Sequence, residues 1–125
     1  PPTIFWDGTQ SRDFTFVDNV VAANVLACKA EGGEVAGKVF NIATGKCTDL
    51  NQTCEILKKL TGYSGEVKYG PERAGDVKHS LADISRAQKH LGYSPRGDFE
   101  EGLSRTIAWY RHPELEPQSA GRVFG

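Results

Sequence analysis

The chain has 125 residues, of which 38% are hydrophobic and 25% charged, as in an ordinary soluble domain with a core. The 15 basic and 16 acidic residues leave a net charge of −1, which argues against nucleic acid or an anionic membrane surface as a partner. No apolar run is long enough to span a bilayer, and the cysteines and histidines show no metal-ligand spacing, so we expect reduced thiols, no metal site and a cytoplasmic location.

Residues 1–42 predict two strands, a helix and a third strand. Residues 3–6 are a short apolar run and residues 12–17 alternate polar with apolar side chains, and both patterns are typical of strands. The spacing then becomes helical from Asp18 to the glycine pair at 32–33. The apolar stripe of this helix consists of Val17, Val21, Val25 and Cys28. Residues 39–42 form an apolar run typical of a strand that is buried on both faces of a parallel sheet.

Residues 43–112 predict three helices and one brief strand, at residues 66–69. Helices are expected at 49–61, 84–91 and 99–112, because each apolar stripe begins beside a capping aspartate and ends before a glycine or a proline. Thr48 is an alternative cap for the first of them. The three stripes consist of Leu50, Cys54, Leu57 and Leu60; Ile84, Ala87 and Leu91; and Phe99, Leu103, Ile107 and Tyr110.

The predicted elements form an α/β fold that is unbalanced, with about four helices and only a few short strands. They lack the βαβ units needed to build a sheet of their own, so we interpret them as part of a larger α/β protein. We expect residues 1–112 to form the domain and residues 113–125 to form a flexible tail. Apolar helix faces and the strand at 39–42 would be exposed in a monomer, which predicts a homodimer or a larger homo-oligomer.

A loop at residues 69–77 carries candidate binding residues. Gly70-Pro71 interrupts the preceding strand, and Gly75 allows the backbone to turn tightly between Arg73 and Asp76. A planar guanidinium matches the oxygens of a phosphate, and a carboxylate matches the hydroxyls of a sugar. The loop therefore predicts one half of a nucleotide-diphosphate site. The alternative is a surface loop in which Arg73 and Asp76 pair only with each other.

Five segments of the chain, in the same order, resemble a known family. They are residues 4–17 (IFWDGTQSRDFTFV), 39–45 (VFNIATG), 71–77 (PERAGDV), 79–84 (HSLADI) and 101–110 (EGLSRTIAWY). Together they resemble the C-terminal substrate-binding part of extended short-chain dehydrogenases/reductases, the NAD-dependent epimerase/dehydratase family, and most closely UDP-glucose and UDP-N-acetylglucosamine 4-epimerases. The resemblance covers residues 3–112 and implies the C-terminal portion of a Rossmann-type epimerase.

This resemblance implies roles for three residues. Arg12 and Arg73 would hold the diphosphate of a UDP-sugar through charge-assisted hydrogen bonds, and Asp76 would accept hydrogen bonds from the ribose hydroxyls. For Arg12 the alternative is a local ion pair with Asp7 or Asp13, which would contribute little at a surface.

Two further positions bear on the same site. Asn41, in the strand expected at 39–42, is a possible ligand contact, and the alternative is a hydrogen bond to neighbouring backbone only. Trp6 stands where the family usually has glycine, close to Arg12 in the sequence. If the backbone there requires a positive φ, a tryptophan is strained, and its ring obstructs a ligand that must approach closely.

The chain lacks the parts that the family's reaction requires. In this family a tyrosine base and a lysine four residues later act with bound NAD, but no Tyr-x-x-x-Lys occurs here and no glycine-rich turn follows a strand. We therefore expect no catalytic residue and no cofactor site in this chain, although NAD serves the parent family. The expected function is that of the UDP-sugar-binding portion of a 4-epimerase-like protein, inactive as an isolated chain. The alternatives are a free-standing module with weak affinity for UDP or UDP-sugars, and a non-binding, self-associating gene fragment.

Overall fold

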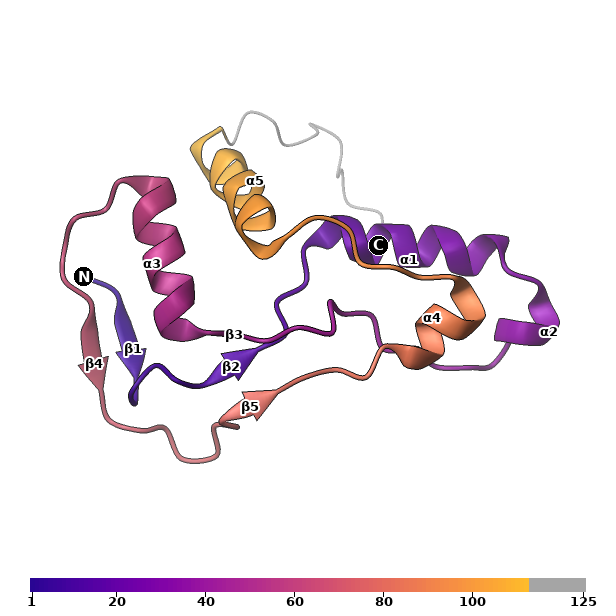
Figure 1. The fold of residues 1–125 in the computed structure, drawn as a ribbon, viewed down its shortest axis with the longest axis horizontal. Helices are drawn as coiled ribbons and strands as arrows, with labels where there is room; N and C mark the ends of the chain where they lie inside the picture. Colours follow the sequence, from indigo (N-terminus) through magenta and orange to yellow (C-terminus); the bar gives the residue numbers. More distant parts are fainter. Residues whose placement is uncertain (113–125) are drawn as a thin grey trace, which may run out of the picture.

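The computed structural model describes residues 1–112, apart from the side chain of Glu34, and the tail expected at 113–125 lies outside the described residues. The elements, in chain order, are β1 (Thr3–Phe5), β2 (Ser11–Arg12), α1 (Val17–Lys29), α2 (Gly32–Val35), β3 (Thr48–Asp49), α3 (Leu50–Thr61), β4 (Lys68–Gly70), β5 (His79–Ser80), α4 (Ser85–Leu91) and α5 (Phe99–Arg111). Figure 1 shows them spread along one direction, with α3, β1 and β4 at one end and α1, α2 and α4 at the other. α5 packs against α3.

The strands are short and form two small sheets. β1 and β4 run parallel, with Ile4 opposite Tyr69. β2 lies between β3, which is antiparallel to it, and β5, which is parallel to it. The four predicted helices are present as α1, α3, α4 and α5, and the short α2 begins at the glycine pair that was expected only to stop α1. The prediction of an incomplete α/β fold with few, short strands is confirmed.

The strand predicted at residues 12–17 is mostly wrong. Pairing ends at Arg12, and α1 already begins at Val17. The alternation of apolar side chains in this segment arises from packing on α5, because Phe14 stacks on Phe99 with ring centroids 5.1 Å apart. In this segment, the alternation of polar and apolar side chains therefore reflects contact with a helix and not membership of a sheet.

The strand predicted at residues 39–42 does not form. No strand within residues 1–112 pairs with this segment, so its backbone groups make no ladder. Phe40 and Ile42 pack against the core between the helices, and Val39 is 77% exposed. The apolar run is consistent with a buried strand only where a neighbouring strand is available.

The predicted caps are confirmed for α3 and α5, but the cap predicted for α4 is wrong, because the N-cap residue of α4 is Ile84 and not Asp83. Asp49 and Asp98 each accept a hydrogen bond of 2.7 Å from the backbone N–H three residues later, at the starts of α3 and α5. Asp83 accepts a bond of 2.9 Å from the Ser85 N–H just before α4, and its hydrogen bonds with Ser85 lower the pKa of the Asp83 carboxyl. α3 and α4 end at the glycines that were expected to stop them.

The hydrophobic core is small and lies between α1 and α4. Its buried members are Ala23, Ala43, Ile84, Ala87, Leu91 and Tyr93. The Tyr93 hydroxyl donates a hydrogen bond of 2.8 Å to the Ala43 carbonyl, which ties the end of α4 to the segment before β3. Burial, and to a lesser degree the Asp13 carboxylate, raises the pKa of Tyr93, so the hydroxyl keeps the proton that this bond requires.

The apolar stripe of α1 faces away from this core. Val17, Val21 and Val25 are 58%, 55% and 46% exposed, as expected for a helix face left uncovered in a single copy of the chain. The predicted stripe of α5 is wrong at one position, because Tyr110 is 74% exposed. Within residues 1–112, no helix has the length and apolar character needed to cross a membrane.

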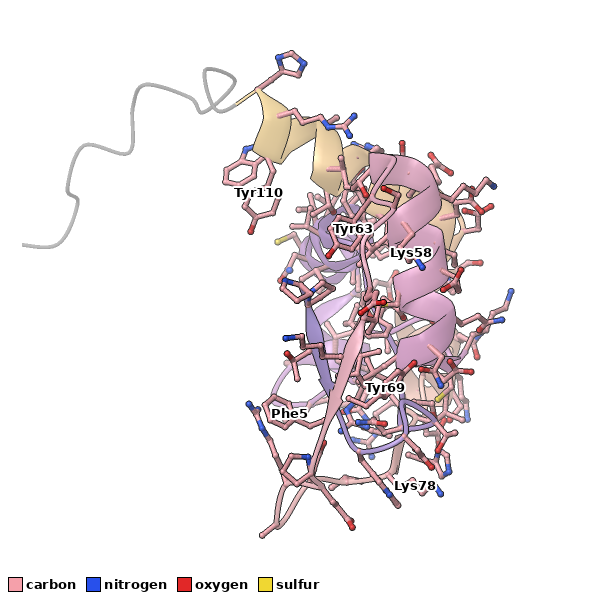
Figure 2. All side chains as sticks on the ribbon, turned by 90° about the vertical axis from the view of Figure 1, so that its left-hand side faces the viewer. Phe5, Lys58, Tyr63, Tyr69, Lys78 and Tyr110 are labelled. Carbon is pink, nitrogen blue, oxygen red and sulfur yellow. The ribbon has the colours of Figure 1, made fainter. Side chains whose placement is uncertain are left out.

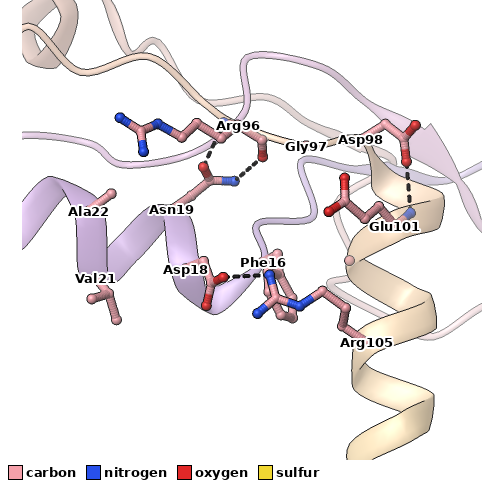
Figure 3. A pocket seen from close by; sticks show the side chains of 11 residues that line it. Phe16, Asp18, Asn19, Val21, Ala22, Arg96, Gly97, Asp98, Glu101 and Arg105 are labelled. Atoms are coloured by element: carbon pink, nitrogen blue, oxygen red, sulfur yellow. Dashed lines mark hydrogen bonds and ion pairs between the residues drawn. The ribbon is translucent and has the colours of Figure 1, made fainter.

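Asn19 joins the start of α1 to the segment that leads into α5 (Figure 3). Its side chain is buried, and its Oδ1 accepts from the Arg96 N–H at 2.8 Å while its Nδ2 donates to the Arg96 carbonyl at 3.2 Å. Beside it, Arg105 of α5 pairs with Asp18 at 2.5 Å across a cavity of about 320 Å³. One buried side chain thus satisfies both backbone groups of a residue 77 positions away in the sequence.

We predict that Asn19→Ala lowers the free energy of unfolding by about 1–3 kcal/mol, because both backbone polar groups of Arg96 lose their partner and a buried side chain is removed. Denaturant unfolding of the two chains measures the difference. Asn24→Ala is the matched control, since Asn24 lies on the same helix, is exposed and bonds only to the Val20 carbonyl. Equal losses in the two variants would contradict this role for Asn19.

Candidate functional site

Two parallel strand pairings bring the predicted loop against the N-terminal segment. β1 with β4 places Phe5 opposite Gly70, where the loop begins. β2 with β5 places Arg12 opposite Ser80, just after the loop ends. Residues 71–78 therefore start and finish beside residues 5–12, at the end of the molecule that Figure 1 draws with β1 and β4.

Arg12 and Asp76 form an ion pair across this junction. Arg12 Nη2 lies 2.5 Å from Asp76 Oδ1, and Arg12 Nη1 donates to the Ser11 carbonyl at 2.9 Å and to the Lys78 carbonyl at 3.4 Å. The side chains of Arg12 and Asp76 are 30% and 38% exposed. Water reaches both groups, so the pair is worth at most about 1 kcal/mol and can be exchanged for other partners.

The partners of these charges differ from both alternatives raised by the sequence. Arg12 pairs with neither of its neighbouring aspartates, and Arg73 does not pair with Asp76. Asp13 instead accepts hydrogen bonds of 2.9 and 2.5 Å from the backbone N–H and hydroxyl of Thr44, and one of 2.9 Å from the Gly45 N–H. Its role is to brace the turn that follows the segment at 39–42.

Arg73 lies over an aromatic ring that the sequence did not point to. Its guanidinium carbon is 3.6 Å from the centroid of the Phe5 ring, which is a cation–π contact. The neighbouring Gly70 makes this possible, because a Cβ at that position would come within 3.2 Å of the Phe5 ring. Gly75 has a φ of +82°, as expected for the tight turn between Arg73 and Asp76. Arg73 makes no ion pair with a carboxylate of residues 1–112.

Trp6 is the one residue other than glycine within residues 1–112 that has a positive φ, of +68°. The condition stated for strain is therefore met. Its N–H donates to the Gly70 carbonyl at 2.9 Å, which extends the β1–β4 pairing by one bond. Lys78 Nζ lies 4.6 Å from the centroid of the Trp6 ring. Figure 2 looks at this end of the molecule and shows Phe5 and Lys78 in its lower part, away from Tyr110.

The turn after Trp6 is pinned to the start of α3. Asn51 donates from its side chain to the Asp7 carbonyl at 3.0 Å and from its backbone to the Gly8 carbonyl at 3.1 Å. Hydrogen bonds from the N–H and hydroxyl of Thr9 lower the pKa of the Asp7 carboxyl, and the charge of Lys78 lowers it further. Sequence reasoning missed Asn51 and Lys78, because neither stands in a motif and both act on residues far away in the chain.

Asn41 lies outside this group. Its Nδ2 donates to the Asp83 carbonyl at 3.3 Å, which is the type of backbone bond that the alternative described. The possible ligand role of Asn41 remains a prediction.

Two further features bear on cofactors, the absence of a metal-binding cluster among the described residues and the position of the glycine pair. No group of three or more His, Cys, Asp or Glu side chains gathers within residues 1–112. Gly32 and Gly33 follow helix α1 and not a strand, and nothing lies within 4 Å of where their Cβ atoms would stand. These glycines therefore do not form the turn between a strand and a helix that holds a pyrophosphate.

Comparison with known proteins agrees with this arrangement. The family model described as GDP-mannose 4,6 dehydratase matches residues 2–106. The chain belongs to the NAD-dependent epimerase/dehydratase family of extended short-chain dehydrogenases/reductases. It is 40% identical over 110 residues to the UDP-glucuronate 4-epimerase of Thermodesulfobacterium geofontis, covering 87% of this chain and 33% of that protein.

Solved structures of the family show the same fold. The UDP-glucose 4-epimerase of Thermotoga maritima, crystallised with UDP-glucose, superposes with a TM-score of 0.82 at 42% identity, over 90% of this chain and 35% of that one. The UDP-glucuronic acid 4-epimerase of Bacillus cereus, in complex with UDP-glucuronic acid and NAD, superposes with a TM-score of 0.81 at 32% identity, over 90% and 36%. This epimerase-family chain thus spans about a third of the length of the relatives that it matches.

We predict that the strain at Trp6 reverses the usual order of alanine and glycine. Trp6→Gly should be more stable than Trp6→Ala by about 1 kcal/mol, because both variants lose the ring but only alanine keeps a Cβ in the left-handed region. Thermal or denaturant unfolding measures the difference. Val77 is the control, since it is exposed and has no positive φ, and there alanine should be the more stable residue by about 0.5 kcal/mol. The same order at both positions would contradict strain at Trp6.

Proposed function

We propose that this chain is the UDP-sugar-binding portion of an NAD-dependent 4-epimerase-like protein. The observation that carries the proposal lies beside the two parallel strand pairings at one end of the fold. Arg12 pairs there with Asp76, 64 residues away in the sequence, and Arg73 lies over the Phe5 ring. The relatives whose structures contain UDP-glucose or UDP-glucuronic acid support a UDP-sugar as the ligand class. Which sugar is bound is not part of the proposal.

The chemistry of the three side chains fits this ligand. A UDP-sugar carries two negative charges on its diphosphate, and two guanidinium groups provide forked N–H donors for them. Asp76 then exchanges its bond to Arg12 for the ribose hydroxyls. The Arg12–Asp76 pair is partly exposed, so the cost of this exchange is small compared with about 1.5–3 kcal/mol for each charged hydrogen bond gained.

Binding and orientation are the extent of what these residues do. The sequence has no Tyr-x-x-x-Lys and its glycine pair follows a helix and not a strand, so the proposal places no hydride or proton transfer on these residues. The proposal includes a cytoplasmic location, which is supported by the three cysteines being free.

We predict that UDP shifts the backbone amide resonances of residues 71–78 and of Arg12 in the 125-residue chain, and that Arg73→Ala weakens binding about 10- to 100-fold. The range follows from the loss of one charged hydrogen-bond donor to a phosphate. Uridine, which lacks the diphosphate, should bind the parent chain and Arg73→Ala equally weakly.

The control for this titration is Arg86→Ala. Arg86 is an exposed arginine on α4, at the other end of the molecule, and donates to the Val39 carbonyl. It should leave UDP binding unchanged. No shifts up to millimolar UDP, or equal losses in the Arg73 and Arg86 variants, would overturn the proposed binding role.

The exposed valines of α1 favour a second property of the isolated chain. Apolar surface is exposed at three valines of α1 and at one valine in the segment 39–42: Val17, Val21, Val25 and Val39. In a solution of this chain alone, no other part of an epimerase is present to cover this surface. The available apolar partner is then a second copy, so we propose a homodimer or larger homo-oligomer through this face.

We predict that sedimentation of the chain depends on concentration at tens of micromolar, and that Val21→Lys with Val25→Lys shifts it to a monomer, because two charges on the face cannot be buried without partners. Val77→Lys is the control, an equally exposed valine in the loop at the opposite end of the molecule. A parent chain that sediments as a monomer throughout would contradict self-association.

A further inference from the structure

The loop at residues 71–78 is fastened to the N-terminal segment at three places. Arg73 lies on the Phe5 ring, Asp76 pairs with Arg12, and Lys78 lies on the Trp6 ring. Every residue from 71 to 80 is exposed, so these contacts, and not burial, hold the loop where it is. Each of the residues proposed to bind UDP is thus already engaged by the protein.

Lys78 contacts the N-terminal segment through both its backbone carbonyl and its side chain. Its carbonyl accepts from the Ser11 N–H at 2.8 Å and from Arg12 Nη1 at 3.4 Å, while its ammonium lies over Trp6. The same guanidinium that receives Asp76 therefore also touches the main chain of Lys78. A movement of the Lys78 backbone away from Ser11 and Arg12 also displaces Asp76, because only one residue separates Lys78 from Asp76.

The backbone at Trp6 shows that this contact has a cost. Each of the other residues with positive φ in the described chain is a glycine, and a tryptophan in that region is strained. The conformation is held from both sides, by the Trp6 N–H bond to Gly70 and by the bonds of Asn51 to the two residues that follow Trp6. Strained residues that the surrounding structure holds in place cluster at functional sites, and Trp6 lies beside a candidate site.

We propose that Trp6 is a latch on the UDP site. Its ring holds Lys78 and so keeps the loop closed on Arg12, with Asp76 in the place that the diphosphate and ribose must take. Ligand enters after Lys78 leaves the ring and the Arg12–Asp76 pair opens. The latch lowers the affinity of this chain for nucleotide diphosphates below what its arginines alone would provide. This inference rests on the proposed function and adds to it a residue that sets affinity without being a required ligand contact.

Ligand binding tests the latch through the sign of a mutational effect. Trp6→Gly removes the ring and suits the backbone, so it should tighten UDP binding about two- to fivefold, the effect of losing one exposed cation–π contact from the closed state. Trp6→Phe keeps an aromatic ring beneath Lys78 and should gain less. The matched control is Trp109→Ala, because Trp109 is the chain's other tryptophan and lies half exposed on α5. Equal or weaker UDP binding by Trp6→Gly would overturn the latch.

Hydrogen exchange tests the latch without any ligand. The Ser11 amide, bonded to the Lys78 carbonyl, reports opening of the loop, whereas the Asp76 amide is bonded to the Arg73 carbonyl within the loop and serves as an internal control. The Ser11 amide should exchange about two- to fivefold faster in Trp6→Gly and in Lys78→Met, which breaks the ring contact without changing the backbone at residue 6. Unchanged exchange of the Ser11 amide would overturn the latch. Faster exchange in variants that still bind no UDP would support the loop contact and refute the proposed function of the chain.

Discussion

The candidate site depends on two very short parallel strand pairings. Phe5 with Gly70 and Arg12 with Ser80 are the points where residues from opposite halves of the chain are tied together. A parallel pair needs a long connection, and here the two connections are residues 6–67 and residues 13–78, which share the helices α1, α2 and α3. If these pairings slipped by one residue, Arg12 would point to the other face, away from Asp76.

Strands this short contribute little to the stability of the fold, and the small hydrophobic core contributes little more. The buried cluster has three alanines among its six members, whereas the larger valines of α1 lie outside it. Full burial of a valine side chain stabilises the folded state by about 1.5–3 kcal/mol, and the exposed valines of α1 do not make this contribution in a single copy of the chain. The exposed face of α1 and the unpaired segment at 39–42 fit a chain that spans about a third of the length of its relatives. Hydrogen bonds between distant segments therefore contribute strongly to the arrangement of the elements. Examples are those of Asn19 with Arg96 and of Asp13 with the Thr44 turn.

Features that depend on near neighbours in the sequence could be predicted, and those that depend on distant partners could not. The caps Asp49 and Asp98 act within three residues, and both were predicted correctly. The strand at 12–17 failed because the partner of Phe14 is Phe99, which no local pattern reveals. Arg73 and Asp76 were predicted from the loop itself, but Arg12 could be added to them only by resemblance to a family, because its partner lies 64 residues away. Trp6 is an intermediate case, since the family's glycine at that position raised a positive φ as one of two possibilities, and the φ of Trp6 is +68°.

In the proposed site, the charges of the loop set the order in which a nucleotide diphosphate would contact the two arginines. Arg73 has no carboxylate partner within residues 1–112, and its place on the Phe5 ring leaves the edge of the guanidinium open to an anion. Arg12 is neutralised by Asp76, whose carboxylate repels a phosphate approaching the same guanidinium. In the proposed binding mode, contact with Arg73 therefore comes first, and Arg12 follows when Asp76 moves to the ribose. Since Asp76 is tied to Lys78 through the chain, and Lys78 to Trp6, we expect the slow part of this proposed binding to lie in the protein's own contacts and not in the meeting of opposite charges.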